Sequence, residues 1–137
     1  MSDHQTYAYF YVTGYQCSPE EITNILGVEP TDTWVKGEKW GTNNIRERKE
    51  SSWIFKTNKS ENDYYSNYHF KELLEKIEGI KGKLKNLPKE CDIGITYVPT
   101  CYFPNVAVIL DSELIQKIAS LGLSVDFDIY SLESDNE

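Results

Sequence analysis

The chain has 137 residues and a net charge of −8, with 39% hydrophobic and 13% aromatic residues. This composition is typical of one globular domain and excludes an intrinsically disordered protein, and no apolar run is long enough to span a bilayer. We therefore treat residues 1–137 as a single domain, with an ordered core of about residues 6–130 and an acidic tail at residues 131–137.

The negative charge is concentrated toward the C-terminal end. Residues 91–137 carry eight acidic side chains and one lysine, which gives −7. This charge repels phosphate backbones, so we expect no nucleic-acid binding; it suits a basic protein partner or serves solubility alone. Cys17, Cys91 and Cys101 are odd in number and widely spaced, and the polar N-terminus shows no signal-peptide pattern. We expect a protein of the reducing cytoplasm.

The first predicted element is a strand over residues 6–13, where tyrosines alternate with smaller apolar side chains and so occupy opposite faces. A helix is predicted next. Ser18 opens a capping box with a proline at the first helical position, and Gly27 supplies a left-handed stop. Apolar residues recur at helical spacing between them, so one stripe of this helix is expected to be buried.

The middle of the chain predicts further elements separated by polar segments. Residues 30–37 are typical of a turn that enters a short extended piece, and residues 38–50 are polar enough to be expected as a mobile loop. Residues 51–57 show a second clear strand pattern. The longest predicted helix covers residues 68–78, where leucine and isoleucine recur at helical spacing.

The last third of the chain predicts a hairpin followed by a helix and a strand. Residues 92–98 show a strand pattern, and prolines mark a turn before a returning strand over residues 106–110. A third helix over residues 111–122 is predicted to have Asp111 or Ser112 as its N-terminal cap and to end at Gly122. The final strand, over residues 123–130, alternates strictly between apolar and polar side chains.

In chain order these elements read β-α-β-β-α-β followed by β-α-β. The first six have the connectivity of a ferredoxin-like unit, and the last three repeat half of it. We therefore predict an α+β fold with a largely antiparallel sheet and helices on one face.

Three pieces of the chain carry a family resemblance. The most specific is the sequence from Ser18 to Gly37, which contains ILGVEPT and WVKG; Trp53 and the closing LGLSVDFDIY, which ends at Tyr130, accompany it. With these residues the chain resembles, over nearly its whole length, the bacterial family called domain of unknown function 4279. The resemblance implies a small cytoplasmic protein, similar to members suspected to be immunity proteins paired with toxins, and it implies no established activity.

Enzyme chemistry is poorly supported by the sequence, and we expect no cofactor and no metal. It contains no nucleophile-elbow, phosphate-loop or dinucleotide-binding glycine motif. His4 and His69 are not at a ligand spacing from the cysteines, and no C-x-x-C pair exists, so we expect no structural zinc site. Cys17 precedes a helix that could lower its pKa, but a small residue filling a turn is the simpler interpretation.

Strand alternation places one group of side chains on the sheet face opposite the helices. If the smaller apolar residues of the first strand face the helices, its tyrosines point away from them, and the last strand adds acidic and tyrosine side chains to that side. Tyrosine combines apolar area with a hydroxyl and is common in protein interfaces, and carboxylates select a basic partner. The predicted partner-binding residues are Tyr7, Tyr9, Tyr11, Asp126, Asp128 and Tyr130.

Other interpretations of this face stay open. The tyrosines also fit a surface covered by residues 38–50, a contact between two copies in a homodimer, or ordinary strand formers. Asp126 and Asp128 lie two positions apart on a strand, a spacing that also suits acid/base chemistry or a divalent cation with further ligands. A solvated outer face is the simpler interpretation of the two aspartates.

A second cluster consists of Trp34, Lys36 and Trp40, followed by the basic stretch 46–49. An aromatic ring beside a cation could clamp an anion or a carbonyl, so these three residues are predicted as an alternative ligand-binding site. For Trp34, a core position at the end of its short strand is the simpler interpretation.

We therefore expect a non-catalytic protein-binding module that holds another protein on its Tyr/Asp face. An immunity-type role against a basic toxin is the most concrete form of this prediction. The alternative is a small-molecule or metabolite-sensing domain with its ligand near Trp34 and Trp40. We expect no cofactor, nucleic-acid partner or membrane partner, and a homodimer is compatible with either function.

Overall fold

The computed structural model describes residues 6–57, 66–101 and 107–131. In these residues the helices are α1 (Pro19–Leu26), α2 (Ser66–Glu78), α3 (Lys81–Leu84) and α4 (Ser112–Ser120), with a 3-10 turn η1 (Thr42–Asn44). The strands are β1 (Tyr7–Thr13), β2 (Asp32–Trp34), β3 (Lys39–Trp40), β4 (Arg46–Glu47), β5 (Ser52–Lys56), β6 (Asp92–Val98), β7 (Thr100–Cys101), β8 (Ser124–Phe127) and β9 (Tyr130–Ser131). Residues 132–137 of the predicted acidic tail lie outside the described residues.

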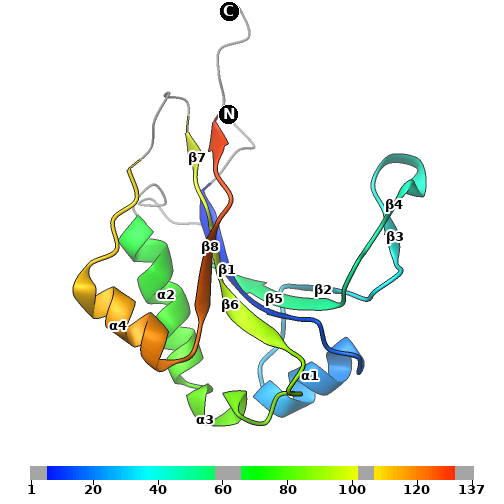
Figure 1. The fold of residues 1–137 in the computed structure, drawn as a ribbon, viewed down its shortest axis with the longest axis horizontal. Coiled ribbons are helices and arrows are strands. Elements are labelled where there is room, and N and C mark those ends of the chain that lie inside the picture. Colours follow the sequence, from blue (N-terminus) through cyan, green and yellow to red (C-terminus); the bar gives the residue numbers. More distant parts are fainter. Residues whose placement is uncertain (1–5, 58–65, 102–106, 132–137) are drawn as a thin grey trace, which may run out of the picture.

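The main sheet has five strands in the order β2-β5-β1-β6-β8 (Figure 1). β1 lies at its centre and pairs antiparallel with β5 and β6. β2 pairs antiparallel with β5 at one edge, and β8 runs parallel to β6 at the other. The predicted α+β fold with a largely antiparallel sheet is confirmed. The ferredoxin-like connectivity stays a prediction.

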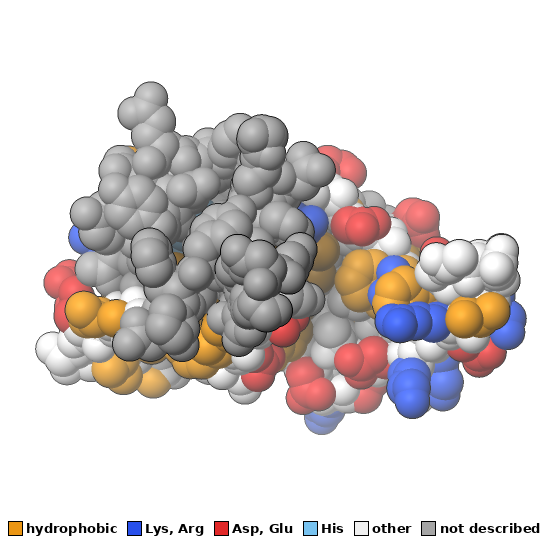
Figure 2. Space-filling view, turned by 90° about the horizontal axis from the view of Figure 1, so that it is seen from above, with side chains coloured by type: hydrophobic (Ala, Val, Ile, Leu, Met, Phe, Trp, Pro, Cys, Tyr) orange, Lys and Arg blue, Asp and Glu red, His pale blue; other side chains and the backbone are white. Residues whose placement is uncertain are grey.

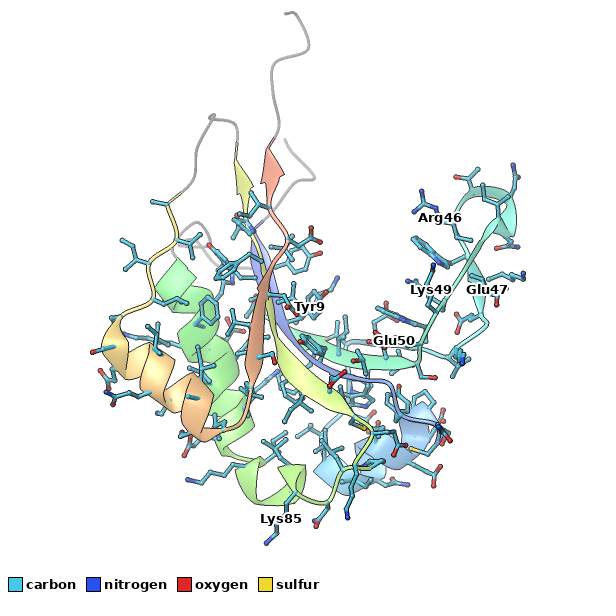
Figure 3. The ribbon with its side chains drawn as sticks, in the orientation of Figure 1. Tyr9, Arg46, Glu47, Lys49, Glu50 and Lys85 are labelled. Carbon is cyan, nitrogen blue, oxygen red and sulfur yellow. The ribbon has the colours of Figure 1, made fainter. Side chains whose placement is uncertain are left out.

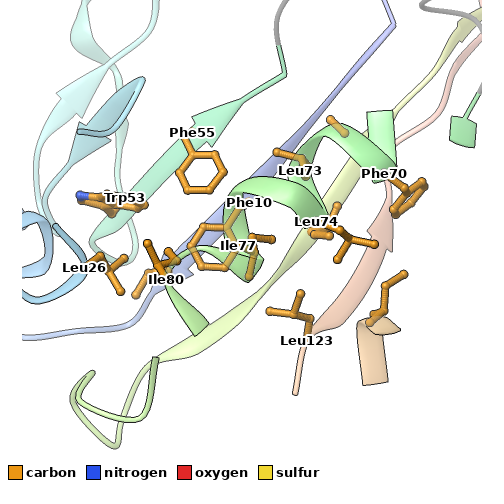
Figure 4. Close-up of a cluster of buried hydrophobic side chains, with 14 of the residues drawn as sticks. Phe10, Leu26, Trp53, Phe55, Phe70, Leu73, Leu74, Ile77, Ile80 and Leu123 are labelled. Carbon is orange, nitrogen blue, oxygen red and sulfur yellow. The ribbon is translucent and has the colours of Figure 1, made fainter. Parts of the chain in front are cut away.

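The core lies between the sheet and the helices, which all contribute to one face (Figure 4). Phe10 of β1 lies at ring-centroid distances of 6.2 Å from Trp53 and 5.0 Å from Phe55, both on β5. Leu26 of α1 and Leu73 of α2 are completely buried in the same cluster. Apolar burial of this kind is the main contribution to the free energy of folding.

The predicted helix caps are present in the structure. The Ser18 hydroxyl accepts a hydrogen bond from the Glu21 backbone N–H, and the Glu21 carboxylate accepts one from the Ser18 N–H at 3.1 Å. Gly27 ends α1 in the left-handed conformation, with φ of 75°. At α4 the cap is Asp111, whose carboxylate accepts from the Leu114 N–H at 2.9 Å. These bonds satisfy backbone groups that have no partner within a helix.

The structure corrects the prediction of a loop at residues 38–50. Lys39 pairs with Glu47 and Trp40 with Arg46, so β3 and β4 form a short hairpin whose turn contains η1. Figure 1 shows this hairpin projecting beyond the end of the main sheet. We call residues 35–49 the arm. The pattern of two short strands was missed because each is only two residues long, too short for an alternation to show.

The predicted hairpin between residues 92–98 and 106–110 is wrong for the part that the structure describes. Residues 107–110 form no strand, and the neighbour of β6 on that side is β8. The described part of the half-repeat therefore lacks its predicted first strand. Val106, the first residue of that predicted strand, lies outside the described residues. Val108 and Leu110 are partly buried against the core, which explains why the segment looked strand-like in sequence.

Candidate functional site

Side chains of β1 alternate between the two faces of the sheet. Ala8, Phe10 and Val12 are completely buried under the helices. The intervening tyrosines are partly buried on the opposite face, which we call the open face. The rings of Tyr7 and Tyr9 are stacked with centroids 6.2 Å apart, and those of Tyr9 and Tyr11 meet edge to face at 6.5 Å.

The open face contains a hollow of about 480 Å³. This volume lies in the range of ordinary ligand and side-chain binding pockets. Ser52 and Thr96 are buried, with 3% and 6% of their surfaces exposed, and both line the hollow. Its lining residues come from five strands and one connecting segment: Tyr9, Tyr11, Thr13, Trp34, Glu50, Ser52, Asp92, Thr96, Ser124 and Asp126.

One hydrogen bond connects β1, at the centre of the sheet, with β8, at its edge. The Tyr11 hydroxyl on β1 donates to a carboxylate oxygen of Asp126 on β8 at 2.9 Å. To reach that far, the Tyr11 ring crosses β6 above Gly94, its register partner. A Cβ atom at position 94 would lie 2.7 Å from Tyr11 Cζ and 2.7 Å from the Ser124 carbonyl oxygen. Only glycine leaves room for the crossing ring.

The environment of Tyr11 keeps its hydroxyl protonated. Burial raises the pKa of Tyr11 well above its ordinary value, and the hydrogen bond to the negatively charged Asp126 raises it further. Tyr11 is therefore a neutral hydrogen-bond donor at physiological pH. It holds the Asp126 carboxylate in one orientation on the open face.

The charge of the hollow is negative. Glu50, Asp92 and Asp126 line it, and none of its described lining residues is Lys or Arg. Figure 3 shows Tyr9 on the sheet and Glu50 at the foot of the arm. Aromatic rings beside carboxylates are the surroundings that a guanidinium or ammonium group prefers. The hollow therefore suits a cationic side chain.

Trp34 connects the hollow to the arm. It pairs with Ser52 at the end of β2 and lies on the open face, so it does not fill the helix-side core. The Arg48 guanidinium carbon lies 4.1 Å from the ring centroid of Trp34 and 4.2 Å from that of Trp40. Arg46 lies over Trp40 at 5.0 Å. We call this series of Trp34, Arg48, Trp40 and Arg46 the ladder.

The ladder bears on the predicted ligand-binding cluster. The space between Trp34 and Trp40 holds Arg48 of the same chain, so a ligand stacked between the two rings would have to displace it. Lys36 is exposed, and its backbone N–H donates to the Ser51 hydroxyl at 3.0 Å. Its side chain is not among the residues that line the hollow.

The predicted partner-binding residues do not all reach the hollow. Tyr9, Tyr11 and Asp126 line it, and Tyr7 continues the row of rings beyond its end. Asp128 is exposed beyond β8 and is not among the lining residues. The backbone of Tyr130 pairs with Thr100, whereas its side chain lies outside the described part of the structure.

Sequence reasoning missed several lining residues that strand register would have found. Thr13 continues the tyrosine alternation of β1, and its register partners are Ser52 on β5 and Asp92 on β6. Partners across a sheet share a face, so all three belong to the open face. Glu50 gave no such signal, because it precedes β5 and its position depends on the arm.

Cys17 and Cys91 show no sign of an activated thiol. Burial raises the pKa of Cys91 to about 11, and burial followed by the charge of Glu21 raises the pKa of Cys17. A raised pKa lowers the thiolate fraction, which is the opposite of what a reactive cysteine needs. No group of three metal-ligating side chains occurs among the described residues. None of the described helices is both long and apolar enough to cross a membrane.

Comparison with known proteins places the chain in a family. The family model described as domain of unknown function (DUF4279) matches residues 4–132. The chain belongs to this family. The comparison with curated proteins found no match, and neither did the comparison with solved structures.

Proposed function

We propose that this DUF4279 protein is a non-catalytic binding module that holds a basic segment of another protein in the hollow of its open face. The observation that supports this most is the composition of the hollow. It combines aromatic rings with three carboxylates, and its described lining contains no cation. In the most concrete version the partner is a basic toxin and this chain is its immunity protein.

Binding would combine two physical contributions. The rings of Tyr9, Tyr11 and Trp34 offer apolar area that a partner side chain covers, and carboxylates pair with its charged end. Asp126 is already oriented by Tyr11, so less side-chain freedom is lost on binding. The net charge of −8 raises the association rate with a basic partner, and added salt lowers that rate.

The test is affinity capture with a variant that removes the hollow's rings and its oriented carboxylate. Tyr9→Ala, Tyr11→Ala and Asp126→Ala are combined in one chain, because their side chains lie outside the helix-side core. We expect the wild type to capture a basic protein from extract of its own cells, identified by mass spectrometry. We expect the triple variant to lose that protein while it still melts cooperatively.

A charge-matched control separates the hollow from the overall charge. Glu50→Gln, Asp92→Asn and Asp126→Asn remove three charges from the hollow. Glu29→Gln, Glu75→Gln and Glu113→Gln remove three exposed charges elsewhere. Only the first set should release the partner. Equal capture by both sets would contradict the proposal. A thermal-shift screen that finds a stabilising metabolite would favour the sensing alternative instead.

A further inference from the structure

We propose that the hollow of one copy receives the arm of a second copy of this chain, so that two chains associate by exchanging arms. This inference rests on the proposed function, in that it gives the acidic hollow a basic occupant. It goes beyond that function because it identifies one occupant by its residues and predicts an oligomeric state.

The charge of the arm is opposite to that of the hollow. Residues 35–49 contain five basic and two acidic side chains, which gives +3 in a chain whose total is −8. Arg46 and Lys49 are exposed cations of the arm, and Lys39 is paired with Glu47 at 3.0 Å. Figure 2 shows basic side chains gathered next to hydrophobic ones at the end of the molecule where the arm lies, with a few acidic side chains among them and further acidic ones nearer the middle.

The arm also exposes apolar surface. Ile45 at its turn is 78% exposed, and Val35 at its base is 40% exposed. A hairpin with two residues in each strand is marginally stable by itself, so contact with another surface would stabilise it. The tyrosine rings of the hollow offer apolar area for Ile45 beside carboxylates for the cations. The two surfaces are therefore complementary in both respects.

The arm does not fold back over the hollow of its own chain. Figure 1 shows it projecting beyond β2 and β5, and Figure 3 shows Arg46 well out along the arm from Tyr9. Its base is fixed by hydrogen bonds from the Gly37 N–H to the Arg48 carbonyl and from the Arg48 N–H to the Glu38 carbonyl, both at 2.8 Å. The ladder holds it further against Trp34. The projecting cations are thus available to another molecule.

Exchange between two copies closes the assembly. If the arm of each chain enters the hollow of the other, the same contact forms twice about a two-fold axis, and no arm or hollow is left unpaired. A basic partner and the second arm would then compete for one hollow. The dimer would be the form that exists in the absence of the partner.

The test measures mass in solution by light scattering as a function of concentration. We expect the wild type to approach twice the 15.9 kDa of one chain. The arm variant Arg46→Glu/Lys49→Glu and the hollow variant Glu50→Lys/Asp92→Lys should each remain monomeric, because each brings like charges together. The hollow variant leaves the Tyr11–Asp126 bond in place.

Mixing the two variants provides the decisive measurement. An equimolar mixture of the two variants should regain the dimer mass, because an acidic arm then meets a basic hollow and a wild-type arm meets a wild-type hollow. The control Glu75→Lys/Glu113→Lys changes two exposed charges on α2 and α4 and should dimerise as the wild type does. Circular dichroism checks that every variant is folded.

Three results would overturn the inference: a monomeric wild type, dimerisation of the arm variant or the hollow variant by itself, or a mixture of the two variants that stays monomeric. The proposed function fails separately. A monomer that captures a basic partner through the hollow supports that function without the arm exchange. If the wild type is a dimer and the triple variant captures the same proteins as the wild type, the arm exchange is supported and the proposed function is not.

Discussion

The two faces of the main sheet are built from the same strands and differ in almost every physical property. On the helix side, Phe10 and Trp53 are completely buried among apolar neighbours, and the Trp53 ring N–H donates to the Thr23 hydroxyl at 2.9 Å. On the open face, Tyr9 and Tyr11 are partly exposed beside carboxylates and hydroxyls. Adjacent residues of β1 therefore have different surroundings: even-numbered ones are buried in the core and stabilise the fold, and odd-numbered ones form the open face, which we propose as a binding surface.

This comparison predicts its largest effect at neighbouring positions of β1. Phe10→Ala should lower the free energy of unfolding by about 3–5 kcal/mol, because it leaves a cavity in the core. Tyr9→Ala, one residue away, should lower it by about 1 kcal/mol or less, because its side chain is partly solvated. Denaturant titration of both variants measures the difference. Similar losses of free energy of unfolding in the two variants would show that the open face contributes as much to stability as the helix side does.

The second effect concerns the crossing of Tyr11 over β6. Gly94→Ala should lower the free energy of unfolding by about 1–3 kcal/mol, because the new methyl group collides with the Tyr11 ring and the Ser124 carbonyl. Adding Tyr11→Ala should recover part of that loss, since one of the two collisions disappears. A double-mutant cycle in denaturant provides the measurement. Strict additivity would contradict the crossing geometry.

A smaller effect is expected from the hydrogen bond itself, and it depends on pH. Tyr11→Phe should lower the free energy of unfolding by about 0.5–1.5 kcal/mol near neutral pH. In the wild type the folded-state pKa of Tyr11 is raised, so this contribution is fully present below the ordinary tyrosine pKa of about 10 and is lost as pH rises above it. The difference between wild type and variant should therefore shrink between about pH 9 and about pH 11. A difference that grows in this range would refute the assignment.

The smallest effect should appear at the ladder. Arg48→Met keeps a long side chain but removes the charge that stacks between Trp34 and Trp40, and should weaken the arm by about 0.5–1 kcal/mol in total. We expect faster amide hydrogen exchange over residues 37–48 and unchanged exchange in β1 and β6. Faster exchange throughout the sheet would show that the arm and the open face are not separable. Lys49→Met, which removes a charge outside the ladder, is the control.

Much of this arrangement was accessible from the sequence because its signals are local. The capping box at Ser18, the stop at Gly27 and the cap at Asp111 depend on residues within one turn of a helix. The alternation in β1 follows from the fact that successive side chains of a strand point to opposite faces of the sheet. These features led to the helix positions, the buried face and the position of the tyrosine row.

What the sequence did not reveal depends on pairing between distant segments. The parallel neighbour of β6 is β8, whereas the sequence predicted a hairpin with residues 106–110, because that segment is short and apolar and follows a proline-marked turn. Residues 38–50 were expected to form a loop, because β3 and β4 are held by cross-strand contacts, such as Trp40 with Arg46, that the sequence does not show. The two predicted sites were separate in sequence, and the fold joins them through Trp34, which borders the hollow and begins the ladder.

The passage of the Tyr11 ring above Gly94 has a consequence for how this family can vary. An aromatic residue at position 11 requires the smallest residue at position 94, and a smaller residue at position 11 removes that requirement. Substitutions at these two sites, 83 positions apart in the chain, should therefore occur together among related sequences, and an acidic residue at position 126 should accompany the tyrosine that binds it.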